Sequence, residues 1–117
     1  MKKQYFYEAK VINVVDGDTI DCKVDLGFYT YVEMRFRLNG VDTAELHSKD
    51  ETKRALAKQA KEFVTNTILN KDVLLQTFKQ DKYGRFLCEV FIDDSSVNRR
   101  LIEMGLGESY EGGKRNV

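Results

Sequence analysis

The stretch Arg35–Glu45 reads Arg-Phe-Arg-Leu-Asn-Gly-Val-Asp-Thr-Ala-Glu. Its first half alternates as a strand does, with apolar residues on one face and Arg35 and Arg37 on the other. A glycine then ends the strand, and the loop that follows carries Asp42 and Glu45. Guanidinium groups suit phosphate oxygens, whereas carboxylates with a nearby carbonyl suit a hard cation such as Ca²⁺ or Mg²⁺. The stretch therefore predicts a phosphate and metal site at the end of a strand.

Three strands are expected up to this point. Glu8–Val15 is rich in β-branched residues, and Tyr29–Leu38 contains the opening arginines. The segment between them, Thr19–Leu26, alternates, and the residues that we expect to face inward are Ile20, Cys22, Val24 and Leu26. Asp16–Gly17–Asp18 is typical of a hairpin turn, because Asp-Gly readily takes left-handed conformations. The three strands should form an antiparallel meander.

The spacing of apolar residues becomes helical after this loop. The residues that share one helix face are Leu56, Ala60, Phe63, Val64, Thr67 and Ile68. Ser48 and Glu51 have the spacing of a capping box, which predicts a helix start near Lys49. Asn70 is a plausible end for this helix.

Two further strands and a short helix follow. The strands are Asp72–Phe78 and Phe86–Ile92, and the helix is Val97–Met104, which Gly105 ends. Its inward residues should be Val97, Leu101 and Met104. The resulting order β-β-β-α-β-β-α matches the OB-fold, a five-stranded Greek-key barrel of the α+β, mainly β class. We expect a single domain over residues 1–117, with Gly107–Val117 as a loose tail.

Composition limits the classes of function. Lys+Arg and Asp+Glu are both 19, which argues against a broad basic surface for nucleic acid but leaves room for a small focused site. No apolar run predicts a membrane span or a signal-peptide core, so we expect the chain as given to be cytoplasmic or already processed, with no membrane contact. Cys22 and Cys88 lie in no metal-ligand spacing and are expected to be buried free thiols.

Three segments carry unusual residues: Asp16–Thr19, Arg37–Glu45 and Asp81–Arg85. Each alone could be an ordinary turn or a solvated strand end. Together with Val97–Asn98, Leu101 and Gly105–Leu106, they occur in the order that is typical of the staphylococcal nuclease (thermonuclease) family. The chain resembles that family over nearly its whole length, and the resemblance also implies an OB barrel.

The resemblance implies roles for individual residues. Asp18, Asp42 and the main-chain carbonyl of Thr43 would bind Ca²⁺, with water completing the shell. Arg37 and Arg85 would stabilise charge on the scissile phosphate. Glu45 would take a proton from the attacking water.

Further positions correspond to substrate contacts in the family. Lys82 and Tyr83 match residues that contact the terminal phosphate and nucleotide, and Tyr110 matches a flanking tyrosine. Asp16 could either support the metal ligands from behind or have only a role in the turn. Family members cleave the bond to the 5′ oxygen of DNA or RNA and leave 3′-phosphate ends, and we expect single-stranded or frayed nucleic acid as the partner.

The chain departs from the family pattern in several places. Ala44 replaces a proline, which loosens the loop before Glu45. The segment from Thr19 to Arg37 is longer, and its added aromatics could stack on bases or pack at an extended hairpin: Phe28, Tyr29 and Tyr31. The third, C-terminal helix of the staphylococcal enzyme has no counterpart, and short relatives, including those of phages, are similar in this respect. The lone His47 is expected to be solvated rather than to bind a metal.

Three functions are compatible with these observations. The preferred one is a Ca²⁺-dependent nuclease, because all five side chains expected for the chemistry are present: Asp18, Arg37, Asp42, Glu45 and Arg85. The alternative is a non-catalytic nuclease-like OB module that binds nucleic acid or a protein. A third is a subunit of a larger assembly, although no obligate protein partner is evident.

Overall fold

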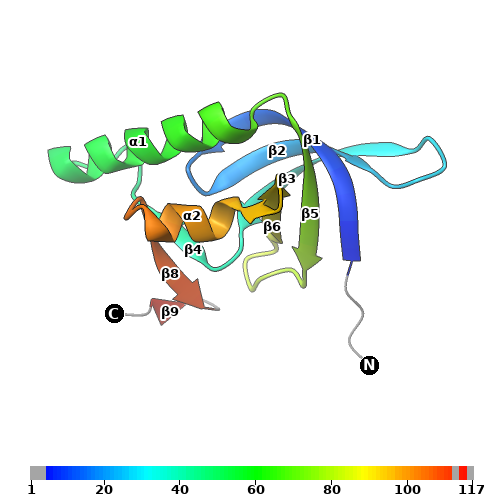
Figure 1. Cartoon of the computed structure of the whole chain (residues 1–117). Coiled ribbons are helices and arrows are strands. Elements are labelled where there is room, and N and C mark those ends of the chain that lie inside the picture. Colours follow the sequence, from blue (N-terminus) through cyan, green and yellow to red (C-terminus); the bar gives the residue numbers. More distant parts are fainter. Residues whose placement is uncertain (1–4, 112–113, 116–117) are drawn as a thin grey trace.

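The computed structural model describes residues 5–111 and 114–115 and contains a closed five-stranded barrel. Its strands are β1 (Tyr5–Asp16), β2 (Thr19–Asp25), β3 (Tyr31–Leu38), β5 (Asp72–Phe78) and β6 (Phe86–Ile92). They are ordered β3-β2-β1-β5-β6, and a parallel pairing of β3 with β6 closes the barrel (Figure 1). The predicted meander and the OB-fold are both confirmed, and β5 and β6 have the predicted bounds.

The helices are α1 (Glu51–Ile68) and α2 (Val97–Glu103), which lie on the same side of the barrel in Figure 1. The predicted helix start near Lys49 is wrong by two residues. Asp50 is the N-cap, because its carboxylate accepts hydrogen bonds from the backbone N–H groups of Thr52 and Lys53. The fully buried positions of α1 are small or β-branched and pack toward β1: Ala57, Ala60, Val64 and Ile68.

The core lies between the barrel and the two helices. Cys22 and Cys88 are both buried and free, as predicted. Two residues expected in the core, Leu26 and Met104, are exposed instead, because each lies at the end of its element, beyond the reach of the opposite layer. Asn98, which had no assigned role, is buried in α2.

The segment expected to be a loose tail, Gly107–Val117, forms strands over seven of its residues. Strand β8 (Gly107–Glu111) pairs with the short β4 (Val41–Thr43), so that Asp42 lies opposite Glu108. The two-residue strands β7 (Ser95–Ser96) and β9 (Lys114–Arg115) complete the described elements, and residues 112–113 and 116–117 lie outside them. Pairing with β8 and contacts with both helices hold β4, and therefore Asp42, in place.

The hairpin between β2 and β3 extends well beyond the barrel (Figure 1). At its tip Phe28 and Tyr29 have φ angles of 56° and 57°, and the N–H of Thr30 donates to the carbonyl of Gly27. Positive φ at both central residues is the pattern of a type I′ turn, which favours Asn and Gly rather than aromatics. Both rings are 97% exposed, so the expectation that they pack at the hairpin is wrong.

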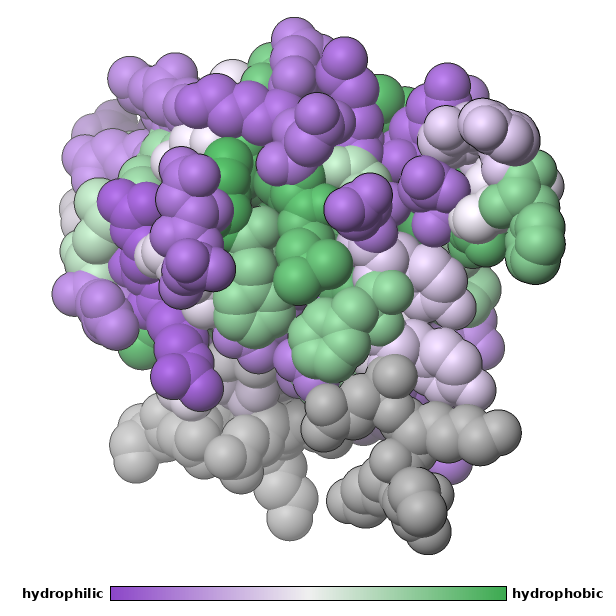
Figure 2. All heavy atoms as spheres, turned by 45° about the vertical axis from the view of Figure 1, so that its right-hand side comes forward, coloured by the Kyte–Doolittle hydropathy of each residue, from purple (hydrophilic) through white to green (hydrophobic). Residues whose placement is uncertain are grey.

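The outward faces of the strands leave part of the surface apolar. Figure 2 shows apolar side chains gathered in the middle of the face that includes the right-hand side of Figure 1, where β1 and β5 run. Phe6, Leu74 and Phe78 are among the exposed apolar residues of these two strands. Within the described residues, neither helix has the length and apolar character needed to cross a bilayer.

Candidate active site

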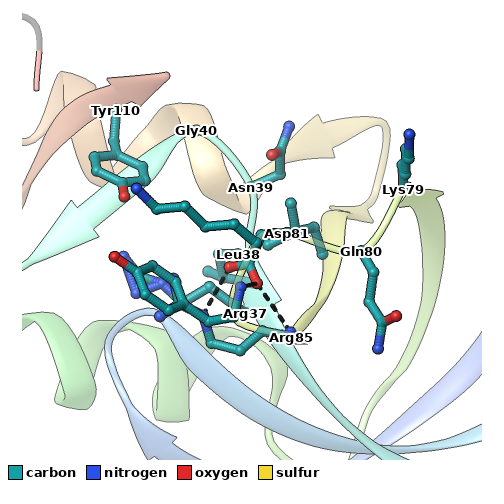
Figure 3. Close-up of a pocket in the computed structure, with 12 residues that line it drawn as sticks. Arg37, Leu38, Asn39, Gly40, Lys79, Gln80, Asp81, Arg85 and Tyr110 are labelled. Carbon is teal, nitrogen blue, oxygen red and sulfur yellow. Dashed lines mark hydrogen bonds and ion pairs between the residues drawn. The ribbon is translucent and has the colours of Figure 1, made fainter. Parts of the chain in front are cut away.

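All nine predicted site residues line one of two adjoining cavities. The first, of about 450 Å³, is lined by Asp16, Asp18, Thr19, Arg37, Asp42, Thr43, Ala44, Glu45, Arg85 and Tyr110. The second, of about 230 Å³, adds Lys82 and Tyr83 and shares Arg37, Arg85 and Tyr110 with the first (Figure 3). His47 is exposed and lines neither cavity. The three sequence segments therefore converge, although they lie on separate elements.

Gly17 allows the turn after β1 to pack closely on the helix. Its φ is not among the positive values, so the left-handed conformation expected for Asp-Gly is not the reason for glycine here. A Cβ at Gly17 would lie 2.7 Å from the Cβ of Ala60 and 3.1 Å from Cγ2 of Thr43. Glycine is required by contact with α1 and β4, and this contact fixes the position of Asp18.

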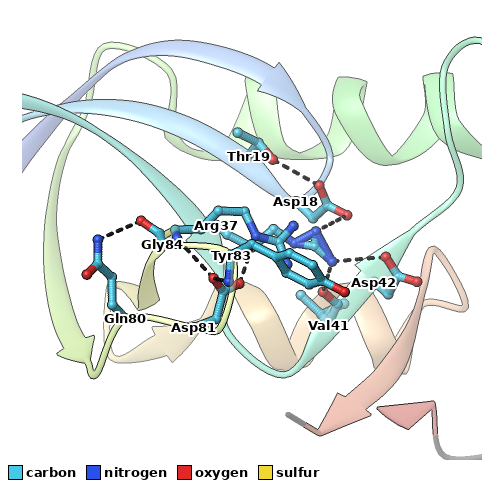
Figure 4. A network of polar contacts seen from close by, with 10 residues as sticks. Asp18, Thr19, Arg37, Val41, Asp42, Gln80, Asp81, Tyr83 and Gly84 are labelled. Carbon is cyan, nitrogen blue, oxygen red and sulfur yellow. Dashed lines mark hydrogen bonds and ion pairs between the residues drawn. The ribbon is translucent and has the colours of Figure 1, made fainter. Parts of the chain in front are cut away.

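Arg37 lies at the centre of a polar network (Figure 4). Its Nη1 is 3.1 Å from Oδ2 of Asp18, its Nη2 is 2.9 Å from Oδ1 of Asp42, and Nη2 also donates to the carbonyl of Val41 at 3.3 Å. The side chain is only 12% exposed. Its Nε is buried and, within the described residues, has no hydrogen-bond partner. The guanidinium thus holds two carboxylates together while one of its donors stays unpaired.

The two aspartates of the first turn have opposite pKa shifts. Burial raises the pKa of Asp16 to about 6, helped by its hydrogen bond to Asp18 and by repulsion from that neighbour's charge. Burial acts against ionisation of Asp18 as well. However, the hydrogen bond from Asp16, the charge of Arg37 and the backbone N–H of Thr43 outweigh it and lower the pKa of Asp18. Asp16 is part of the turn, because its carboxylate accepts from the backbone N–H of Asp18.

Asp81 organises the loop that presents Arg85. Its carboxylate accepts hydrogen bonds from the backbone N–H groups of Tyr83 and Arg85 and from Nε of Arg85, the last at 2.7 Å (Figure 4). Burial alone would raise the pKa of Asp81, but these bonds and the Arg85 charge lower it. Gly84 has φ +78°, a conformation that glycine adopts without strain. Sequence reasoning gave Asp81 no role, although an Asp four residues before an Arg in a tight loop signals this arrangement.

Aromatic rings lie beside the cationic groups. Nζ of Lys82 and Cζ of Arg85 lie 5.2 Å and 5.1 Å from the centre of the Tyr83 ring. Cζ of Arg37 lies 5.9 Å from the centre of the Tyr110 ring. The N–H of Tyr110 donates to the carbonyl of Gly40, which fixes this part of β8 beside the second cavity. These rings give the cavities flat apolar walls next to positive charge.

Asn98 supports the site from within the core. Its Oδ1 accepts from the N–H of Val90, and its Nδ2 donates to the carbonyls of Asn39 and Cys88. These bonds join α2, β6 and the turn that leads from Arg37 to Asp42. The sequence signal was the Val97–Asn98 pair of the family pattern, to which no role was assigned.

Glu45 and the oxygen ligands define what chemistry is possible. Glu45 is exposed, it lines the first cavity, and no hydrogen bond or ion pair of its carboxylate is found within residues 5–111. Asp18 and Asp42 with the carbonyl of Thr43 form an oxygen-only donor set, which fits a hard cation that takes water for its remaining ligands. In the described part of the chain, however, no three acidic, histidine or cysteine side chains gather around one point. Arg37 and a cation would have to share the two carboxylates.

Comparison with known proteins identifies the family. The family described as "Staphylococcal nuclease homologue" matches residues 35–116. The chain belongs to the staphylococcal nuclease family. A thermonuclease of Staphylococcus hyicus is 33% identical over 102 residues, covering 86% of this chain and 57% of that protein.

Other relatives have similar coverage. The thermonuclease of Staphylococcus intermedius is 34% identical over 85% of this chain and 57% of its own length. An uncharacterised protein of Methanocaldococcus jannaschii is 31% identical, covering 89% of this chain and 59% of that protein. The chain therefore spans less than two thirds of these relatives.

Proposed function

We propose that this member of the staphylococcal nuclease family is a Ca²⁺-dependent nuclease that hydrolyses phosphodiester bonds of DNA or RNA. Cleavage of the bond to the 5′ oxygen would leave 3′-phosphate ends. The observation that carries the proposal is the convergence of five charged side chains on one cavity: Asp18, Arg37, Asp42, Glu45 and Arg85. The names of the thermonuclease relatives support the same reaction class.

The two arginines bind the scissile phosphate. Arg37 is almost buried, so its charge acts where water screens it little, and its unpaired Nε is a donor for a phosphate oxygen. Arg85 is more exposed, but Asp81 orients it by accepting hydrogen bonds from its backbone N–H and its Nε. Both guanidinium groups stabilise the charge that grows on the equatorial oxygens as phosphorus becomes five-coordinate.

Glu45 is the general base. Its exposed carboxylate accepts a proton from water, the water oxygen bonds to phosphorus, and the bond to the 5′ oxygen breaks. The oxygen that leaves takes a proton from solvent. Because only Ala44 separates Glu45 from the end of β4, the pairing of β4 with β8 limits how far alanine in place of proline can loosen this loop.

Asp18, Asp42 and the Thr43 carbonyl are the residues that would hold Ca²⁺. When bound, the ion supplies positive charge next to the phosphate and orients the nucleophile. Asp18 is buried. Its carboxylate is held in one orientation because it accepts hydrogen bonds from the N–H of Thr43 and the hydroxyl of Thr19.

The test is cleavage of single-stranded DNA and of RNA with Ca²⁺ or with a chelator. Glu45→Gln and Arg85→Ala should each lower the rate about 100- to 1,000-fold. The matched controls are Glu62→Gln on the exposed face of α1 and Arg99→Ala, which lines neither cavity; both should retain the wild-type rate.

Two outcomes would contradict the proposal. Cleavage that is indifferent to Ca²⁺ removal or to Arg85→Ala would contradict the site assignment. Retained nucleic-acid binding with no cleavage under any condition would support the non-catalytic module instead.

A further inference from the structure

A third cavity, of about 420 Å³, extends from the candidate active site along the outer side of β3. It shares Thr19, Arg37 and Arg85 with the first cavity, so the two adjoin each other. Its own lining includes Arg35 and Phe86, which no step of the proposed reaction uses. We name this space the β3 groove.

Arg35 supplies positive charge to the β3 groove. Its Nε and Nη2 bind the carboxylate of Asp21 at 2.8 Å and 3.2 Å, which uses two of the five N–H donors of the guanidinium. The side chain is 63% exposed, so the remaining donors face solvent. The ion pair with Asp21 therefore orients the guanidinium while leaving it able to bind another anion.

Phe86 supplies a flat apolar surface. It is the first residue of β6 and pairs with Phe36 where β3 and β6 close the barrel, so its backbone position is rigid. The residue is 44% exposed, although Phe36 beside it is buried. A fixed, half-exposed aromatic ring close to arginines is suited to stacking with a nucleic-acid base, which tolerates any sequence.

The register of β3 sets the size of the groove. Arg35 and Arg37 lie on the same face two residues apart, about 6.6 Å along the strand, a distance similar to the length of one extended nucleotide. The next residue on this face is Glu33, which lines the far end of the groove and lies opposite Lys23 of β2. A carboxylate there disfavours a further phosphate.

We propose that the β3 groove binds the one nucleotide adjacent to the scissile phosphodiester, with its phosphate on Arg35 and its base on Phe86. The inference rests on the proposed nuclease function and deepens it by assigning one nucleotide of the substrate to this surface. A base stacked on Phe86 must be unpaired, and stacking reads no base edge.

The experiment measures binding without cleavage. Glu45→Gln protein in chelator is titrated with fluorescent oligothymidylates of increasing length at several salt concentrations. Phe86→Leu, which retains an apolar side chain but loses the ring, should weaken binding of the longer oligonucleotides about 10-fold. Arg35→Gln should reduce the slope of log Kd against log salt by about 0.7. The matched controls are Phe6→Leu, another half-exposed aromatic, and Arg99→Gln, neither of which lines the groove.

Length dependence gives an independent readout. Affinity should rise when one nucleotide is added beyond the phosphate bound by Arg37 and should change little on further extension. If Phe86→Leu and Arg35→Gln bind like the parent while retaining its circular dichroism spectrum, the groove assignment is overturned. If binding depends on both residues but the wild-type protein with Ca²⁺ never cleaves, the groove is retained and the nuclease function is rejected. Absence of binding by the parent protein would overturn both.

Discussion

Replacing Gly17 by alanine tests the argument that this residue is required by packing. The added Cβ would lie 2.7 Å from the Cβ of Ala60 and 3.1 Å from Cγ2 of Thr43. Carbon atoms prefer separations of about 3.5–4.0 Å, so the turn and α1 would have to separate by nearly an ångström. No side-chain rotation can relieve a contact between two Cβ atoms.

The expected cost of Gly17→Ala is about 1–3 kcal/mol, the range for overpacked cores. For a chain of 117 residues this corresponds to a fall in Tm of roughly 4–12 °C. Urea denaturation measures the free energy of unfolding. Far-UV circular dichroism is the suitable probe, because the chain has no tryptophan to report by fluorescence. Nuclease activity should fall as well, since Asp18 follows Gly17 in the chain.

A double-mutant cycle isolates the contact. Ala60→Gly alone should cost roughly 1–2 kcal/mol, from lower helix propensity and a lost buried methyl group. Combined with Gly17→Ala it should cost at least about 1 kcal/mol less than the sum of the single changes. Additive effects would refute the packing argument.

Gly27 is the matched control because its requirement is conformational. It has φ +84°, and no atom lies within 4 Å of the point that a Cβ would occupy. Asparagine tolerates left-handed backbone better than alanine does, so Gly27→Asn should cost less than Gly27→Ala. At Gly17 asparagine should cost at least as much as alanine, because its larger side chain meets the same contacts. A smaller cost for asparagine at Gly17 would indicate that backbone conformation, rather than contact, selects glycine there.

Three further substitutions test other parts of the structure, each by urea denaturation. Asp81→Asn should be destabilising at pH 7. Its difference from wild type should shrink as pH falls below about 4 and vanish once the pH is below the lowered pKa of Asp81 in the folded protein, because the carboxylate is stabilising only while ionised; a pH-independent difference would contradict this. The double change Phe28→Asn and Tyr29→Gly should stabilise the hairpin tip by about 1–2 kcal/mol by relieving positive φ, whereas no gain would mean that the rings contribute to folding. Asn98→Ala should cost about 3 kcal/mol by leaving buried groups unpaired, while exposed Asn66→Ala should stay within about 0.5 kcal/mol; equal effects would show that the three Asn98 hydrogen bonds contribute little.

Local patterns predicted the elements whose form depends on their own residues. Alternation gave the bounds of β5 and β6, because each strand has one face on the core and one on solvent. The start of α1 was misplaced because two capping signals compete there. The Ser48 hydroxyl accepts from the N–H of Asp50, and it is the Asp50 carboxylate that caps the helix.

Elements that depend on distant partners could not be predicted in this way. Residues 107–111 have no alternation and two flanking glycines, yet they form β8 because β4 offers an edge. Gly107 itself lies against Val41, where a Cβ would approach Cγ2 of Val41 to 2.6 Å. Such contacts depend on the register in which β4 pairs with β8, and the sequence of either strand alone does not predict that register.

The site shows the same division. Motifs predicted which residues would meet, but not that Arg37 would bridge Asp18 and Asp42. That contact arises because Thr19 and Arg37 pair across β2 and β3, which places the guanidinium beside the first turn. The role of Asp81 was missed although its spacing from Arg85 hinted at an ion pair, because the two backbone N–H groups that it also accepts from are brought to it only by the closed loop.

The Arg37 cluster combines two features that folding alone leaves unsatisfied. One guanidinium faces two carboxylates, and the pKa of neighbouring Asp16 rises to about 6 beside them. At the same time Nε of Arg37 is a buried donor with no acceptor among the described residues. A cation would stabilise the excess negative charge, and an anionic oxygen would satisfy the donor. Because such violations of local rules concentrate at functional sites, their occurrence at one arginine supports joint binding of a metal ion and a phosphate there.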